Sequence, residues 1–82
     1  MALVLTKEEY ERKKAMISKA EMLKKKAQEK ISSIKDMEKA IRLEDMIALY
    51  RMNVMKSPDI NKFDDAAIEI AMIPIYETII TE

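Results

Sequence analysis

The sequence predicts an all-α protein, and three observations support this fold class. None of the 82 residues is glycine, so tight turns that require positive φ are disfavoured. Apolar residues recur at intervals of three or four over long stretches, which is the period of an α-helix. Charged residues make up 37% of the chain and fall mostly between these apolar positions. We expect one small helical domain over residues 1–82, with three amphipathic helices at about 7–32, 34–55 and 58–73 and a short C-terminal arm.

The first helix has a clear start signal at Thr6. Thr6 and Glu9 form the pattern of a capping box, in which each side chain accepts a hydrogen bond from the backbone N–H of the other residue. Leu5 and Tyr10 stand where a hydrophobic staple would pack. Apolar residues then predict one buried side, at Met16, Ala20, Leu23, Ala27, Ile31 and Ile34.

Ser32 and Ser33 mark a candidate break between the first two helices. Serine competes with helical hydrogen bonding, and Ser33 with Asp36 resembles a second, weaker capping box. The sequence permits one continuous rod or two helices joined by a short corner, and we favour a corner near Ser32. The buried side of the second helix is predicted at Met37, Ala40, Ile41, Ile47, Tyr50 and Val54.

The third helix is predicted to begin after Ser57, which stands at a capping position before Pro58 and Asp59. One side of this helix carries Ile60, Phe63, Ala67, Ile70 and Ala71, while Ile68, Met72 and Ile73 lie elsewhere around it. A helix that is apolar on most sides is expected to be buried on most sides. Pro74 should stop or kink this helix, which leaves residues 75–82 as an extended arm or a continued helix.

The composition indicates a protein that is not an enzyme and needs no cofactor or metal. Cysteine and histidine are absent, which removes thiolate ligands, the commonest metal ligand and the usual general base near neutral pH. The absence of glycine disfavours phosphate-binding loops. We expect a cytoplasmic protein, because the apolar start of the chain is too short for a signal peptide and no apolar run is long enough to span a bilayer.

A lysine cluster, "KKKAQEK" at residues 24–30, raises the question of nucleic-acid binding. Most of these lysines fall off the apolar side of the first helix, where they would face solvent. The sequence pI is about 6.3 and aromatic residues are few, so a basic surface with stacking side chains is not indicated. Nucleic acid is therefore an unlikely partner.

The charge distribution and the length of the first helix suggest assembly, and most of the methionines are assigned to the core. Residues 1–39 carry a net charge of +4 and residues 40–82 a net charge of −4, which would favour an antiparallel homodimer. A helix over residues 7–32 would be roughly 39 Å long and would overhang a compact chain of this size. Met16, Met37 and Met46 are predicted to fill the core, whereas Met52 and Met55 are better placed for an exposed patch.

Over its whole length, from "MALVLTKEEYERKK" through "SPDINKFDD" to "YETIITE", the chain resembles the rIII family of lysis-inhibition accessory proteins of T-even bacteriophages. The resemblance implies a cytoplasmic antiholin, which binds the short cytoplasmic segment of the phage holin and delays host-cell lysis. No site residue carries over from the resemblance. Two other functions are compatible with the sequence: a small phage regulator that binds a host transcription protein or nucleic acid, and a structural assembly factor.

An amphipathic holin segment would suit a hydrophobic groove between helices. The third helix, with its excess of apolar residues, is the candidate for this groove, although the same residues would equally suit a central core element. Acidic side chains at Asp64, Asp65 and Glu69 would attract a basic peptide near the membrane. The predicted partner-binding residues are Phe63, Asp64, Ile68, Met72 and Ile75.

Overall fold

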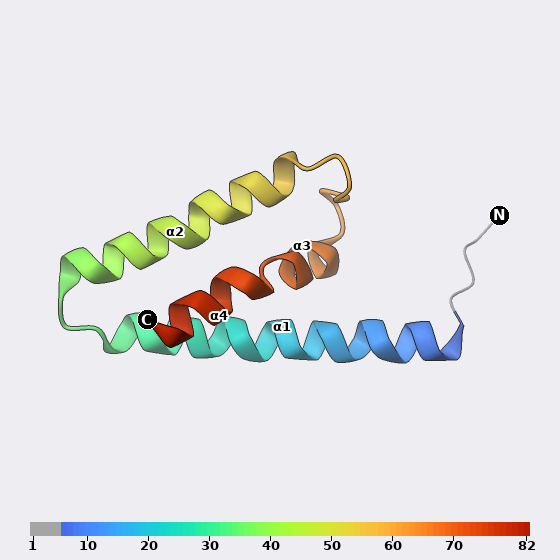
Figure 1. Cartoon of the computed structure of the whole chain (residues 1–82), viewed down its shortest axis with the longest axis horizontal. Helices are drawn as coiled ribbons and strands as arrows, with labels where there is room; N and C mark the ends of the chain where they lie inside the picture. The colour runs from blue at the N-terminus through green and yellow to red at the C-terminus, as the bar shows by residue number, and fades with distance from the viewer. Residues whose placement is uncertain (1–5) are drawn as a thin grey trace.

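The structure, a computed structural model, describes residues 6–82 and is all-helical over them, as predicted. The helices are α1 (Lys7–Ser33), α2 (Met37–Lys56), α3 (Asp65–Ala71) and α4 (Ile73–Thr81). Helices α1 and α2 diverge from a corner, and α3 and α4 run back between them, so that the C-terminus lies near the corner (Figure 1). The prediction of three helices is wrong for the described residues, which contain four.

Helix α1 begins as the sequence predicts. The Thr6 hydroxyl accepts a hydrogen bond from the Glu9 backbone N–H at 3.2 Å, and Glu8 and Glu9 place negative charge in the first turn. Leu5, the other half of the predicted staple, lies outside the described residues, and Tyr10 is exposed. Along the predicted apolar side, Ala20, Ala27 and Ile31 are buried.

The predicted corner is confirmed, and the continuous rod is excluded. Helix α1 ends at Ser33, whose hydroxyl donates to the Lys30 carbonyl at 2.7 Å, and Ile34 is extended. The Asp36 carboxylate then accepts from the backbone N–H groups of Glu38 and Lys39, and α2 starts at Met37. The second helix thus begins three residues later than predicted, because Asp36 rather than Ser33 caps it.

Residues 57–64 form a loop, which contradicts the prediction of a helix from residue 58. Two side chains stabilise this loop locally: the Ser57 hydroxyl accepts from the Asp59 N–H at 3.3 Å, and the Asn61 side chain accepts from the Phe63 N–H at 2.9 Å. Such short-range bonds give the backbone an alternative to the helix. Phe63, predicted to lie on a buried side, is 94% exposed in this loop.

Helix α3 begins only at Asp65, where Asp64 accepts from the Ala67 N–H at 3.1 Å. The chain breaks the helical path at Met72 and resumes with Pro74 in the first turn of α4, a position where a proline needs no N–H partner. The predicted C-terminal arm is therefore wrong, and the alternative of a continued helix is correct.

The core lies where α4 packs against α1 and α2. Its cluster of buried side chains comprises Ala27, Ile31, Leu43, Ile68, Met72, Ile75, Tyr76 and Ile79. The end of α4 is held by Lys30 on α1, whose Nζ donates to the backbone carbonyls of Ile80, at 2.9 Å, and Glu82. A lysine at this position also complements the negative end of the α4 dipole.

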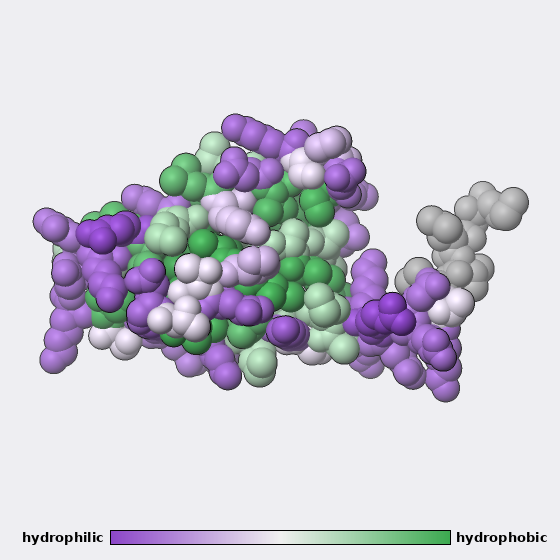
Figure 2. Space-filling view, in the orientation of Figure 1, coloured by the Kyte–Doolittle hydropathy of each residue, from purple (hydrophilic) through white to green (hydrophobic). Residues whose placement is uncertain are grey.

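The molecule is elongated, with principal extents of 51 × 24 × 15 Å and a radius of gyration of 14.7 Å. The N-terminal turns of α1 extend beyond the other helices, as the predicted length of this helix requires (Figure 1). The surface of this overhang is largely hydrophilic in the view of Figure 2. A chain that folds in this way leaves part of α1 without intramolecular packing.

One carboxylate, that of Glu69 on α3, contacts side chains from the three other helices. Arg51 on α2 donates to its Oε1 at 2.7 Å, and the Tyr76 hydroxyl on α4 donates to its Oε2 at 2.8 Å. Lys24 on α1 places its Nζ 3.5 Å from Oε1. Arg51 also donates to the Tyr76 hydroxyl, at 3.3 Å. We call Glu69 and these three partners the four-helix brace.

The brace shifts the pKa values of its members. Partial burial tends to raise the pKa of Glu69, but hydrogen bonds from Arg51 and Tyr76 and the charges of Arg51 and Lys24 outweigh it, so this pKa lies below its ordinary value. Burial, assisted by the Glu69 carboxylate, raises the pKa of Tyr76 to about 12. Glu69 is therefore ionised and Tyr76 neutral at physiological pH.

Met72→Ala should destabilise the fold far more than Phe63→Ala. Met72 is 0% exposed, and truncation of a buried methionine costs about 2–5 kcal/mol. Phe63 is in the exposed loop, where substitutions change stability by about 0.5 kcal/mol or less. Urea denaturation of both variants measures the difference, and comparable losses would show that Phe63 is buried.

Glu69→Gln should lower the free energy of unfolding by about 1–3 kcal/mol, since hydrogen bonds to charged groups contribute about this much. Glu77→Gln is a matched control. It removes an exposed pair with Lys19, at 3.9 Å, and should cost less than about 1 kcal/mol. Chemical denaturation compares the two, and equal effects would mean that the brace contributes no more than a surface ion pair.

The brace also predicts loss of stability at both extremes of pH. Glu69, whose folded pKa is lowered, stabilises the fold above the ordinary glutamate pKa of about 4.3, and this contribution is lost as the pH falls below that value. Tyr76, whose folded pKa is raised, contributes fully below pH ~10 and loses its contribution as the pH rises through about 12. Thermal melts of Glu69→Gln and Tyr76→Phe should show weaker acid and alkaline dependence, respectively, than the wild type. Unchanged dependence would contradict these assignments.

Candidate partner-binding surfaces

The five residues predicted to bind a partner separate into two groups in the structure. Ile68, Met72 and Ile75 are buried in the core cluster and share no open surface. Phe63 and Asp64 lie at the start of α3, where Phe63 is almost fully exposed and Asp64 is half-buried. A partner can reach Phe63 and Asp64 without opening the core. The predicted role of the whole set stays a prediction.

The acidic residues expected to attract a basic peptide have other partners. Glu69 is at the centre of the four-helix brace. Asp64 caps α3 and lies 3.9 Å from Lys13 on α1. Asp65 is exposed in the first turn of α3. Two of these three carboxylates therefore have structural contacts, and little free acidic charge remains beside Phe63.

An apolar hollow lies between the N-terminal half of α1 and the start of α3. It has a volume of about 350 Å³ and is lined by Tyr10, Lys13, Lys14, Ile17 and Ala66. Tyr10, Lys13, Lys14 and Ile17 recur at three- and four-residue intervals, so the helix turns them toward one side. The lysine stems can add apolar surface to the walls while their ammonium groups stay in water.

The hollow is close in sequence to the exposed loop, because Ala66 in its lining is three residues from Phe63. The ion pair between Lys13 and Asp64 joins the rim of the hollow to this loop. We call the hollow together with Phe63 the loop-side surface. It combines an aromatic side chain, an apolar depression and two lysines.

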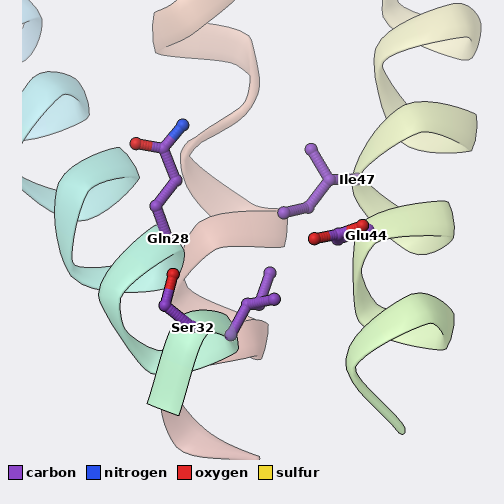
Figure 3. A pocket seen from close by; sticks show the side chains of 5 residues that line it. Gln28, Ser32, Glu44 and Ile47 are labelled. Atoms are coloured by element: carbon purple, nitrogen blue, oxygen red, sulfur yellow. The ribbon is translucent and has the colours of Figure 1, made fainter. Parts of the chain in front are cut away.

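A second hollow lies near the corner, between the end of α1 and the first half of α2 (Figure 3). Its volume is about 400 Å³, and Gln28, Ile31, Ser32, Glu44 and Ile47 line it. Figure 3 shows Gln28 and Ser32 on α1 facing Ile47 and Glu44 on α2 across the opening. Its lining thus combines amide, hydroxyl, carboxylate and aliphatic groups.

A third candidate surface is the outer side of α2. Met37 is 74% exposed and Ile41 is 51% exposed, so the prediction that both are buried is wrong. Met52 and Met55 are exposed, as predicted. The side of α2 that faces the core instead carries Leu43, with Met46, Ile47, Tyr50 and Val54 half-buried around it. Figure 2 shows apolar surface reaching the outer edge of the molecule over the middle of α2.

The lysine cluster has partly structural roles. Lys24 belongs to the four-helix brace, and Lys30 holds the end of α4. Lys25 and Lys26 are exposed, as the prediction of a solvent-facing side requires. In the described part of the chain, no group of three or more acidic, histidine or cysteine side chains is arranged to hold a metal ion. Across residues 6–82, no helix has both the length and the apolar character needed to cross a membrane.

The exposure of Met52 and Met55 on α2 was predicted from the sequence, whereas the apolar hollow and the continuous outer side of α2 were not. A signal for the latter exists: Ile41, Ala48 and Met55 are separated by seven residues each, the spacing of a coiled-coil seam. No signal for the hollow is apparent, because it depends on where α3 begins. Comparison of the chain with known protein families, curated proteins and solved structures finds no significant match.

Proposed function

We propose that the chain is a cytoplasmic antiholin-type regulator, which binds the cytoplasmic segment of a phage holin and delays lysis of the host cell. The observation that supports this proposal most is the loop-side surface, which comprises Phe63, 94% exposed, and an apolar hollow whose lining residue Ala66 follows Phe63 by three residues. Single exposed apolar side chains are common on protein surfaces, but an exposed aromatic side chain is of the kind that anchors an interface with a partner. The resemblance to T-even lysis-inhibition proteins supplies the identity of that partner.

The loop-side surface suits a short amphipathic peptide. The hollow of about 350 Å³ is large enough for one or two apolar side chains, and Phe63 would cover them from the loop. Lys14 on the rim would pair with an acidic residue on the polar side of the peptide, whereas Lys13 lies 3.9 Å from Asp64. The attraction of a basic peptide by acidic side chains, expected from the sequence, stays a prediction for Asp65, which is exposed.

Binding of this segment would delay lysis by a simple physical effect. A partner that binds the cytoplasmic segment of the free holin would shift the equilibrium away from the hole-forming assembly. The regulator needs no catalytic group for this role. Its affinity for the segment, and its concentration, decide the length of the delay.

The proposal includes a homodimer. Helix α2 keeps an apolar outer side, on which Met37, Ile41 and Met52 are exposed. A chain of this length also buries only about 60–65% of its unfolded surface, so a second copy would add to a thin core.

Phe63→Ala should weaken binding of a synthetic peptide with the sequence of a T-even holin's cytoplasmic segment by at least about tenfold, because central aromatic residues contribute about 2 kcal/mol or more at interfaces. Met22→Ala is the matched control. Met22 is 50% exposed on α1 but lies off the loop-side surface, so its truncation should leave the affinity within about twofold. Isothermal titration calorimetry with the full chain measures both.

The same site can be tested in infected cells. Tagged wild-type chain should capture the holin from infected cells whether or not nuclease is present, and Phe63→Ala should capture much less. Capture that disappears with nuclease would favour the nucleic-acid alternative. Absence of peptide binding by the wild-type chain would overturn the antiholin proposal.

A further inference from the structure

We infer that two copies of the chain pair through the outer sides of their α2 helices, in an antiparallel arrangement that leaves both loop-side surfaces free. This inference deepens the homodimer of the proposed function and is independent of holin binding. It rests on the apolar side chains that α2 exposes and on the charges that flank them. The occupant of this surface is thus a second copy of the same chain.

The outer side of α2 has the pattern of a helix-pairing seam. Ile41, Ala48 and Met55 recur every seven residues, or two helical turns, and Met37 and Met52 extend this line toward both ends of the helix. All five are exposed. Ala48, the smallest, lies in the middle of the line, where a small side chain lets two helices approach closely. We call these five residues the α2 seam.

Charges beside the seam favour antiparallel over parallel pairing. The first half of α2 carries the acids Glu38, Glu44 and Asp45 beside the bases Lys39 and Arg42, whereas the second half carries Arg51 and Lys56 and no acid. A parallel pair would place acids beside acids, whereas an antiparallel pair places acids beside bases. The opposed helix dipoles also favour the antiparallel arrangement.

The two-fold symmetry of such a pair fixes a register. A contact from residue i of one copy to residue j of the second copy must occur twice. In an antiparallel pair, side chains on one flank of the seam meet side chains on the same flank of the second copy's seam. With successive residues about 100° apart around the helix, Glu38 and Lys56 share one flank of the seam. Pairing Glu38 with Lys56 of the second copy places the symmetry axis beside residue 47 of each helix.

The same register brings the apolar side chains together. Ile41 meets Met52 of the second copy, Met37 meets Met55, and the two Ala48 residues lie near the symmetry axis. Charge and apolar contacts therefore indicate one arrangement.

The surface that remains free agrees with the proposed function. The α2 seam is formed by α2 alone, whereas α1, α3 and the loop before α3 form the loop-side surface. A standard interface covers about 800 Å² on each partner, roughly one-eighth of the 6460 Å² surface of the chain. A dimer would thus present two copies of the holin-binding site.

Light scattering on the full chain at micromolar concentration should give twice the chain mass of 9.5 kDa. Ile41→Glu should yield the monomer, and Met22→Glu, a matched substitution at an exposed position of α1, should leave the dimer intact. Circular dichroism of both variants checks that the helices persist. A monomeric wild type overturns the dimer, and a dimer that survives Ile41→Glu overturns the α2 seam while leaving holin binding to its own assay.

The register can be tested by charge reversal. Glu38→Lys and Lys56→Glu should each weaken the dimer about five- to tenfold, because each turns two symmetric pairs from attractive to repulsive. The double variant should return the dissociation constant to within about twofold of the wild type. If the substitutions acted only through helix stability, the dimer of the double variant would be weaker than the dimer of either single variant, because both substitutions oppose the helix dipole. That result would overturn the register.

Cysteine cross-linking tests the direction. The chain contains no cysteine, so one introduced thiol reports on one position. Ala48→Cys should form a disulfide between two copies, because the two positions lie near the symmetry axis. Met37→Cys should not, because antiparallel pairing separates its two copies by about 30 Å and a disulfide needs Cα atoms within ~7 Å. Efficient cross-linking of Met37→Cys would overturn the antiparallel arrangement.

Discussion

The arrangement of the four helices depends on the contacts that the carboxylate of Glu69 makes. This carboxylate is the point where α1, α2, α3 and α4 each contribute a side chain, through Lys24, Arg51, Glu69 itself and Tyr76. Removal of one partner from such a cluster leaves the others with unfulfilled hydrogen bonds, so the cost exceeds that of an isolated surface pair. The brace fixes α3, the shortest helix, between the two long ones. The position of α3 in turn shapes the loop-side surface.

The helical class, the first helix and the corner could be predicted because their signals are local. Thr6 and Asp36 each cap a helix through atoms within three residues, and the α1 apolar pattern is long enough to fix its buried side. The beginning of the third helix could not be predicted from the same rules. Ser57 and Pro58 favour a helix start, but a hydroxyl that caps a helix also stabilises a turn, and here it bonds to the N–H of Asp59 within the loop.

The two sides of α2 show why the surfaces were harder to predict than the helices. Both sides carry apolar residues at helical spacing, so periodicity alone leaves open whether Ile41 or Leu43 faces the core. Leu43 is buried because α4 packs on that side of α2. The choice depends on contacts between residues far apart in the sequence. Phe63 was likewise expected in the core because it is aromatic, although its loop places it in solvent.

The proposed regulator therefore uses two surfaces, the loop-side surface for the holin segment and the α2 seam for a second copy. This division is consistent with a small core that uses Ile68, Met72 and Ile75 internally and leaves other apolar side chains exposed. Two binding sites on one dimer would raise the local concentration of sites near a membrane that carries many holin molecules.

The separation of the two surfaces is tested most directly by backbone NMR of the wild-type chain, recorded in a dilution series and in a titration with the holin peptide. Dilution should shift amide resonances along the α2 seam, around Ile41, Ala48 and Met55. The peptide should shift resonances around Tyr10, Ile17 and Phe63. Peptide-induced shifts confined to α2, with the loop-side resonances unchanged, would contradict the assignment of these surfaces.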